Sequence, residues 1–226
     1  MLTLHHLEYS QSFRILWLLE ELGAPYELKS YNRDHETNLA PADYKALSPL
    51  GTAPVVTEGD VVLAESNAII EYVLDAHPDS DLAPAAGSKD RARHLFWFHS
   101  SSGSLMPLQS VEMVLGLLET RAPWPISALL RSVFSQVRKL FTGPRMKALL
   151  DLMESDLGKQ PFFGGDKLTA ADITLVYSMY ALQDKGLFEG GYRNINAWFD
   201  RIEALPSFQS ARAKDDRERI AFRFEN

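Results

Sequence analysis

The sequence contains no cysteine among its 226 residues. Disulfide bonds and a protein thiolate are therefore excluded, and any thiol chemistry at its site must come from a ligand. An excess of positive charge is also missing, because 23 lysine and arginine residues face 30 aspartate and glutamate residues, for a formal charge of −7. Nucleic-acid binding requires a basic patch that displaces counterions, so we expect no nucleic-acid partner.

Long apolar runs are the third absence. No stretch of about 18 uncharged apolar residues is present to form a membrane span, and residues 1–5 lack the charged start and apolar run of a secretion signal. We therefore expect a cytoplasmic protein without stable membrane insertion. The apolar segment 111–118 is also compatible with a membrane surface, but burial in a helical domain is the stronger interpretation. Apolar residues make up 46% of the chain, enough for one large or two small domains.

The first third of the chain alternates strand and helix patterns, and Gly23 ends the first helix. A Glu-Gly-Asp turn predicts that the last two strands form an antiparallel hairpin. The order β-α-β followed by β-β-α is that of a thioredoxin-like domain, which we place over 1–80. The predicted elements are strands near 2–4 and 26–28, a helix over 12–22, strands over 53–57 and 61–63, and a helix over 66–76.

The rest of the chain has helical spacing only. Residues 81–88 carry Pro84 and Gly87 without apolar periodicity and form the predicted linker, so 89–226 is the predicted all-helical domain. The fold class is therefore α/β plus all-α. A break is expected at Gly143-Pro144. The predicted helices span 91–118, 127–157, 170–185 and 194–205.

Thr169 is the best-specified helix start. Its hydroxyl can accept an amide N–H of the first turn, while Asp172 reaches back to the N–H of Thr169, which is a capping box. We interpret this pair as a folding feature and not as part of a site.

Two separate segments indicate one binding site for a small peptide anion. Pro54, in the sequence Gly51-Thr52-Ala53-Pro54, lacks an N–H and can adopt the cis form that turns the backbone of Ala53 toward an extended ligand. Ser66 opens a helix whose free N–H groups can receive a carboxylate, and Glu65 can accept from the amino group of the same ligand.

Together with Ser10 and Arg14 upstream, these segments resemble in order and spacing the glutathione-binding domain of the cytosolic glutathione transferases that use serine. The stretch 168–173 is similar to the capping segment of that family's helical domain, and 4–7 and 123–125 resemble a fungal and bacterial branch. The resemblance implies a homodimer with glutathione as co-substrate, a small hydrophobic electrophile, and no tightly bound cofactor.

The resemblance also implies that Ser10 is the catalytic residue. A thiol with a pKa near ~8.5 is mostly protonated at neutral pH, so the enzyme must stabilise the thiolate. A hydroxyl at a helix N-terminus can donate to sulfur with the support of the helix dipole. Two alternatives remain at this point: Ser10 or Ser12 only caps the helix, or Tyr9 is the donor.

The remaining expected site residues follow from the same resemblance. Ser66 takes the γ-glutamyl carboxylate, Glu65 takes its ammonium group, and the loop over 32–41 closes on the glycine end. Leu39, with Asn38 beside it, stands where a basic or amide side chain often contacts the glycine carboxylate, and Thr52 stands where lysine is common. These departures suggest weaker or differently held glutathione. The expected glutathione contacts are Asn38, Leu39, Thr52, Ala53, Pro54, Glu65 and Ser66, and the expected electrophile pocket consists of Tyr9, Phe13, Ser102 and Met106.

No metal site is expected, because His5 and His6 are adjacent on a strand and point to opposite faces. Glutathione transfer to an electrophile is the function that these residues favour. Peroxide or disulfide reduction by the same thiolate is a second enzymatic possibility, and a non-catalytic glutathione-binding protein is a third.

Overall fold

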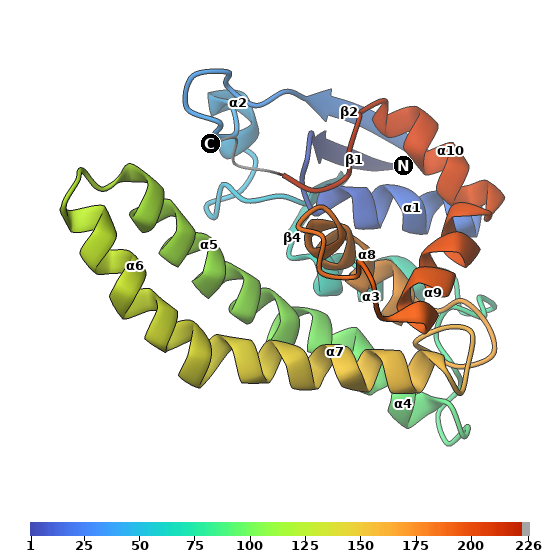
Figure 1. The fold of residues 1–226 in the computed structure, drawn as a ribbon. Coiled ribbons are helices and arrows are strands. Elements are labelled where there is room, and N and C mark those ends of the chain that lie inside the picture. The colour runs from blue at the N-terminus through green and yellow to red at the C-terminus, as the bar shows by residue number, and fades with distance from the viewer. Residues whose placement is uncertain (223–226) are drawn as a thin grey trace.

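The computed structural model describes residues 1–222, and its N-terminal part is built on a four-stranded sheet (Figure 1). The strand order is β2-β1-β3-β4, with β1 parallel to β2 and antiparallel to β3, and with β3 antiparallel to β4. This arrangement confirms the predicted thioredoxin-like domain. The strands are β1 (Leu2–Leu7), β2 (Tyr26–Tyr31), β3 (Val55–Glu58) and β4 (Val61–Ala64).

Alternation along β1 sends its side chains to two different cores. Leu4 faces α1 (Ser12–Leu22) and α3 (Ser66–Asp75), within the main core of the protein. Leu7 faces the opposite side, where it packs with Tyr44 of α2 (Ala42–Lys45) in a smaller core. His6 therefore lies on the α1 side of the sheet and His5 on the α2 side.

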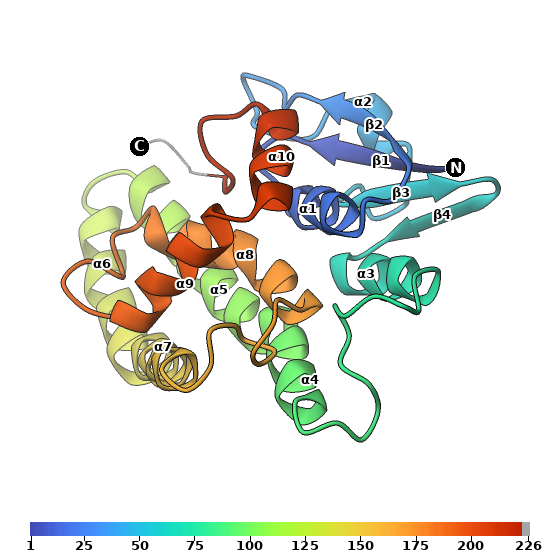
Figure 2. The same cartoon turned by 90° about the vertical axis from the view of Figure 1, so that its right-hand side faces the viewer.

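The C-terminal part is all helical, as predicted, and shares the main core with α1 and α3 (Figure 2). The central helix α8 is buried along most of its length and contacts α1, α3 and α4. Residues 76–90, which include the predicted linker, form turns and irregular segments. The helices are α4 (Arg91–Ser100), α5 (Met106–Arg121), α6 (Ile126–Val137), α7 (Gly143–Leu157), α8 (Ala170–Gln183), α9 (Arg193–Glu203) and α10 (Pro206–Asp215).

The helical domain differs from prediction at three places. The segment 111–118 was expected to be buried, but no residue of α5 is buried, and Val114 is 48% exposed. Gly143-Pro144 does not break the helix, because a π turn (Arg138–Thr142) leads directly into α7 and places Pro144 in its first turn, where no N–H is needed. A Cβ on Gly143 would lie 2.6 Å from the carbonyl oxygen of Arg138, so this turn requires glycine. Helix α10, which packs against α1, was not predicted.

The predicted capping box at the start of α8 is present. Thr169 accepts from the amide of Ala171, and buried Asp172 accepts from the amide of Thr169 at 3.0 Å. Asp172 also accepts from the amide of Phe163 at 2.8 Å and from the indole N–H of Trp198 at 2.9 Å. The carboxylate of Asp172 thus caps α8 and also joins α8 to α9 through Trp198. Within residues 1–222, no helix has the length and apolar character that crossing a membrane demands.

Candidate functional site

The N-terminus of α3 brings together residues that are far apart in sequence. Ser66 is buried and its hydroxyl donates to the side-chain oxygen of Gln11 at 3.3 Å, while Glu65 beside it is exposed and has a positive φ of 75°. Arg14 of α1 lies 3.5 Å from the Ser66 hydroxyl. Helix N-termini carry unpaired N–H groups and partial positive charge, so this corner of the protein is suited to an anion.

Arg14 is a fully buried cation whose hydrogen-bond partners among the described residues are all neutral. Its guanidinium donates to Gln11 at 2.7 Å and to Ser178 of α8 at 3.1 Å, and its Nε has no partner. Burial lowers the pKa of Arg14 to about 10. A buried charge of this kind is costly without an anion beside it, so the site is electrostatically complete only with a negatively charged ligand.

The turn before β3 has the expected backbone form. The Ala53–Pro54 bond is cis, Pro54 is buried, and Thr52 is exposed. Gly51 has φ of 60°, a conformation that favours glycine. The backbone of Ala53 therefore lies at the sheet end where the ligand was expected.

The loop between β2 and α2 is held by its own polar groups. The carboxylate of Asp34 accepts from the amide of Thr37 at 2.8 Å, and the main-chain oxygen of Asp34 accepts from the amide of Asn38 at 2.8 Å. Asn38 and Leu39 are exposed. Arg33 donates to the main-chain oxygen of Asn38 at 3.0 Å, which places a cation in this loop. Arg33 lies within the loop 32–41 that was expected to close on the glycine end, but it was not among the expected glutathione contacts.

Ser10 lies at the end of β1, before α1, and is buried. Its hydroxyl lies 2.7 Å from the main-chain oxygen of Leu7 and 2.7 Å from the hydroxyl of Ser12, and its oxygen accepts from the amide of Ser12 at 3.2 Å. The N-cap position of α1 is Gln11, which makes no side-chain capping bond. Ser10 therefore accepts from the amide of the first helical residue and already has an acceptor for its own proton.

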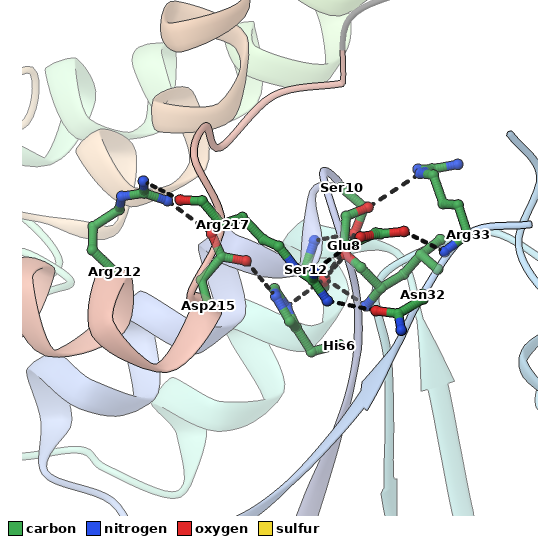
Figure 3. Close-up of polar contacts among 10 residues, drawn as sticks. His6, Glu8, Ser10, Ser12, Asn32, Arg33, Arg212, Asp215 and Arg217 are labelled. Carbon is green, nitrogen blue, oxygen red and sulfur yellow. Dashed lines mark hydrogen bonds and ion pairs between the residues drawn. The ribbon is translucent and has the colours of Figure 1, made fainter. Parts of the chain in front are cut away.

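The hydrogen bonds of Ser10 continue to the C-terminal helix (Figure 3). Ser12 lies 2.8 Å from Nδ1 of His6, and Nε2 of His6 lies 2.7 Å from the carboxylate of Asp215. Arg212 donates to the other oxygen of Asp215 at 2.8 Å. Sequence reasoning missed His6, Ser12 and Asp215 as a group, because no local signal connects positions 209 residues apart.

His5 and His6 point to opposite faces, as predicted. His5 contacts the hydroxyl groups of Tyr31 and Thr57, each at 3.0 Å, on the α2 side of the sheet. Among residues 1–222, no three histidine, cysteine or acidic side chains are grouped as metal ligands.

Tyr9 lies under the C-terminal segment. It has φ of 50°, its main-chain oxygen accepts from Tyr177 at 3.4 Å, and the guanidinium of Arg219 lies 5.2 Å from its ring centre. Phe222 covers Arg33 nearby, at 4.8 Å. Residues 219–222 thus lie beside the predicted thiol position.

The expected electrophile residues divide into two groups. Phe13 is only 1% exposed and packs edge to face on Phe208 of α10, so it belongs to the core and does not open onto a pocket. Met106 is half-buried and its sulfur lies 3.7 Å from the guanidinium of Arg14, which places it beside the anion corner. Ser102 is exposed in the π turn η1 (Ser101–Leu105).

Comparisons with known proteins agree with this geometry. Residues 1–75 match the family description "Glutathione S-transferase, N-terminal domain", and residues 135–206 match "Glutathione S-transferase, C-terminal domain". Glutathione S-transferase 3 of Schizosaccharomyces pombe is 32% identical, over 95% of this chain and 88% of that protein. Glutathione S-transferase 1 of Saccharomyces cerevisiae is 28% identical, over 95% of each. A crystal structure of a glutathione S-transferase from Actinobacillus pleuropneumoniae is 31% identical, with a TM-score of 0.74 over 96% of this chain and 93% of that one.

Proposed function

This chain belongs to the glutathione S-transferase family, and we propose that it binds glutathione between the N-termini of α1 and α3 and activates its thiol there. The observation that carries this assignment is Arg14, a buried cation with neutral partners beside Ser66 at the start of α3. The γ-glutamyl carboxylate supplies the missing negative charge and accepts from the Ser66 hydroxyl and the amides of the first turn. Glu65, exposed at the same corner, takes the ammonium group.

The other end of the tripeptide extends along the cis-Pro turn toward the β2–α2 loop. The backbone of Ala53 beside Pro54 is free to pair with the cysteinyl residue of glutathione in the manner of an added strand. Arg33 lies in the loop together with Asn38, which gives the glycine carboxylate a cation that the side chains of Leu39 and Thr52 do not provide.

The chemical step is attack of the glutathione sulfur on a hydrophobic electrophile. The thiol loses its proton, the thiolate sulfur forms a bond to an electrophilic carbon, and a leaving group departs or a double bond is opened. Ser10 stabilises the thiolate by turning its O–H from the main-chain oxygen of Leu7 toward the sulfur, with support from the dipole of α1. Tyr9 is the competing donor. The names of the relatives favour transfer over a non-catalytic role.

The electrophile binds on the helical-domain side of the thiol. Met106 lies next to Arg14, and its flexible thioether suits apolar ligands of varied shape. Ser102, one turn earlier, and Tyr9 complete the proposed pocket, whereas Phe13 does not take part.

We also propose that the protein is a cytoplasmic homodimer. Large apolar side chains lie exposed on two separate surfaces, and a second copy would cover them: Val62 of β4 is 53% exposed, and Leu129 of α6 is 65% exposed. Analytical ultracentrifugation tests the oligomeric state directly.

Calorimetry tests the binding assignment. The double variant Glu65→Ala with Ser66→Ala should bind glutathione at least ~10-fold more weakly, because it removes one charged contact and one hydroxyl contact. Glu71→Ala, which removes an exposed carboxylate further along the same helix, is the matched control and should bind like wild type. Equal affinity in the double variant and wild type would show that the site lies elsewhere.

A further inference from the structure

The hydrogen-bonded chain behind Ser10 runs inward when His6 is neutral. Arg212 donates to one oxygen of Asp215, and Nε2 of His6 lies 2.7 Å from the other oxygen. A neutral imidazole carries one N–H, so when Nε2 donates to Asp215, Nδ1 of His6 is the acceptor. Ser12 then donates its hydroxyl proton to Nδ1 over 2.8 Å.

This direction determines what Ser10 presents to a ligand. Its single hydroxyl proton has two acceptors at 2.7 Å, the main-chain oxygen of Leu7 and the oxygen of Ser12, and both lie inside the protein. In the free protein Ser10 therefore offers an oxygen lone pair to its surroundings and directs its proton inward. A lone pair suits the S–H of a neutral thiol, whereas a thiolate needs a donor.

We propose that His6 is the internal acceptor of the thiol proton, reached through Ser10 and Ser12. The inference rests on the proposed function, because it requires the glutathione thiol to lie at Ser10. The S–H proton passes to the oxygen of Ser10, the Ser10 proton passes to the oxygen of Ser12, and the Ser12 proton passes to Nδ1 of His6. Sulfur keeps both electrons of the S–H bond and becomes a thiolate, while His6 becomes an imidazolium.

Reversal of the chain keeps the contacts among His6, Ser12 and Ser10, while Ser10 no longer donates to the main-chain oxygen of Leu7. His6 now donates to Ser12, Ser12 donates to Ser10, and Ser10 donates to the thiolate that it must stabilise. The imidazolium keeps its contact with the carboxylate of Asp215. The resting alignment and the product alignment thus use the same heavy-atom positions.

The path is closed to water and to other charges. His6, Ser10, Ser12 and Asp215 are each at most 6% exposed, so bulk water does not compete for the proton along the way. On α10 the charged groups facing His6 are Asp215 and Arg212. Beyond the end of β1, the nearby carboxylate of Glu8 is engaged by the amide of Arg33 at 2.5 Å and by Arg217 at 3.3 Å (Figure 3).

The rival explanation is that the chain only holds α1 and α10 against the sheet, and that the thiol proton leaves for water. Nitrogen NMR of the wild-type protein separates the two, with S-methylglutathione as the ligand that makes the same contacts but has no thiol proton. We expect the His6 nitrogens to change from the pattern of one neutral tautomer to that of an imidazolium with glutathione, and to stay neutral with S-methylglutathione. In parallel, calorimetry in buffers of different ionisation enthalpy should give well under one proton released per thiolate formed.

Variants assign the NMR signals to His6 and test whether His6 accepts the thiol proton. In His6→Asn the side-chain oxygen takes the place of Nδ1 and keeps an acceptor for Ser12, but it cannot take the proton. This variant should show less thiolate absorbance at neutral pH and release one proton for each thiolate that forms. His5→Asn, on the same strand but the opposite face, is the matched control and should behave like wild type. If His6→Asn does not fold, Asp215→Asn should lower the thiolate fraction in the same direction.

The outcomes are distinct. A thiolate that forms in the wild type while His6 stays neutral, with one proton released, would overturn the relay and leave the proposed function standing. Failure of S-methylglutathione to bind would instead overturn the proposed function, and the relay with it.

Discussion

Arg14 of α1 donates to the hydroxyl of Ser178 on α8 over 3.1 Å, a contact that joins the thioredoxin-like domain to the helical domain across 164 positions. The cation that faces the proposed carboxylate is therefore positioned by both domains. Gln11 holds it from the first domain at 2.7 Å, so the guanidinium is oriented before any ligand arrives. Preorganisation of this kind reduces the entropy cost of binding.

Replacing Arg14 with methionine should separate binding from stability. The charge has only neutral partners in the free protein, so an apolar side chain of similar length should leave the melting temperature unchanged or raise it. The γ-glutamyl carboxylate would lose a charge-assisted hydrogen bond of about 1.5–3 kcal/mol, and glutathione should bind at least ~10-fold more weakly. Thermal unfolding and calorimetry measure the two effects. Exposed Arg121→Met is the control, and equal glutathione affinity in Arg14→Met and wild type would contradict the assignment.

Ser10→Ala should lower turnover by at least ~10-fold while changing glutathione affinity much less, because the hydroxyl acts on the thiolate and not on the γ-glutamyl contacts. The absorbance of the bound thiolate, followed against pH, should show a raised thiol pKa in Ser10→Ala and no change in Tyr9→Phe. The opposite result would transfer the role to Tyr9. No shift in either variant would favour backbone amides as the stabilising groups.

Local sequence patterns predicted the helices and strands whose defining residues are neighbours in the sequence. Apolar spacing predicted the helix that ends at Gly23, the Glu-Gly-Asp turn predicted the hairpin around Gly59, and both are observed where expected. Helix α10 was missed because its sequence is mostly polar and its buried apolar residues are Phe208 and Ala211, of which Phe208 packs on Trp17 of α1. Long-range packing of this kind leaves no periodic signal.

In the candidate site too, short sequence signatures could be predicted and long-range contacts could not. Ser66 and the cis-Pro turn were predictable because each has a short sequence signature with a clear backbone role. Phe13 was expected in the electrophile pocket, but it points inward from α1 onto Phe208. Partners of Ser10 such as His6 and Asp215 depend on how α10 docks, which the spacing of residues along the chain does not determine.

Asp172→Ala should be among the most destabilising single changes in the chain. It would leave the buried amides of Phe163 and Thr169 and the indole N–H of Trp198 without an acceptor, and each unsatisfied donor costs about 1–3 kcal/mol. Denaturant unfolding should show a loss of about 3 kcal/mol or more. The control Asp151→Ala removes an exposed i,i+4 pair with Lys147, which solvent screens, so its loss should be much smaller. A similar loss in both variants would contradict the network at α8.

Buried His94 should make the protein less stable in mild acid. Burial lowers its pKa from 6.5 to about 4, with smaller contributions from Arg91 and His99. Between these two values the unfolded chain binds a proton that the folded protein does not, so the stabilisation is present above pH 6.5 and is lost as the pH falls toward 4. The loss amounts to about 3 kcal/mol.

The substitution His94→Leu removes this titrating group. Its free energy of unfolding should therefore fall less steeply between pH 6.5 and 4 than that of wild type, whatever its value at neutral pH. Urea unfolding at several pH values measures the slope, and exposed His99→Gln serves as the control with a slope near that of wild type. An identical slope in His94→Leu and wild type would mean that this histidine is already protonated in the folded protein, in conflict with its burial against Phe98.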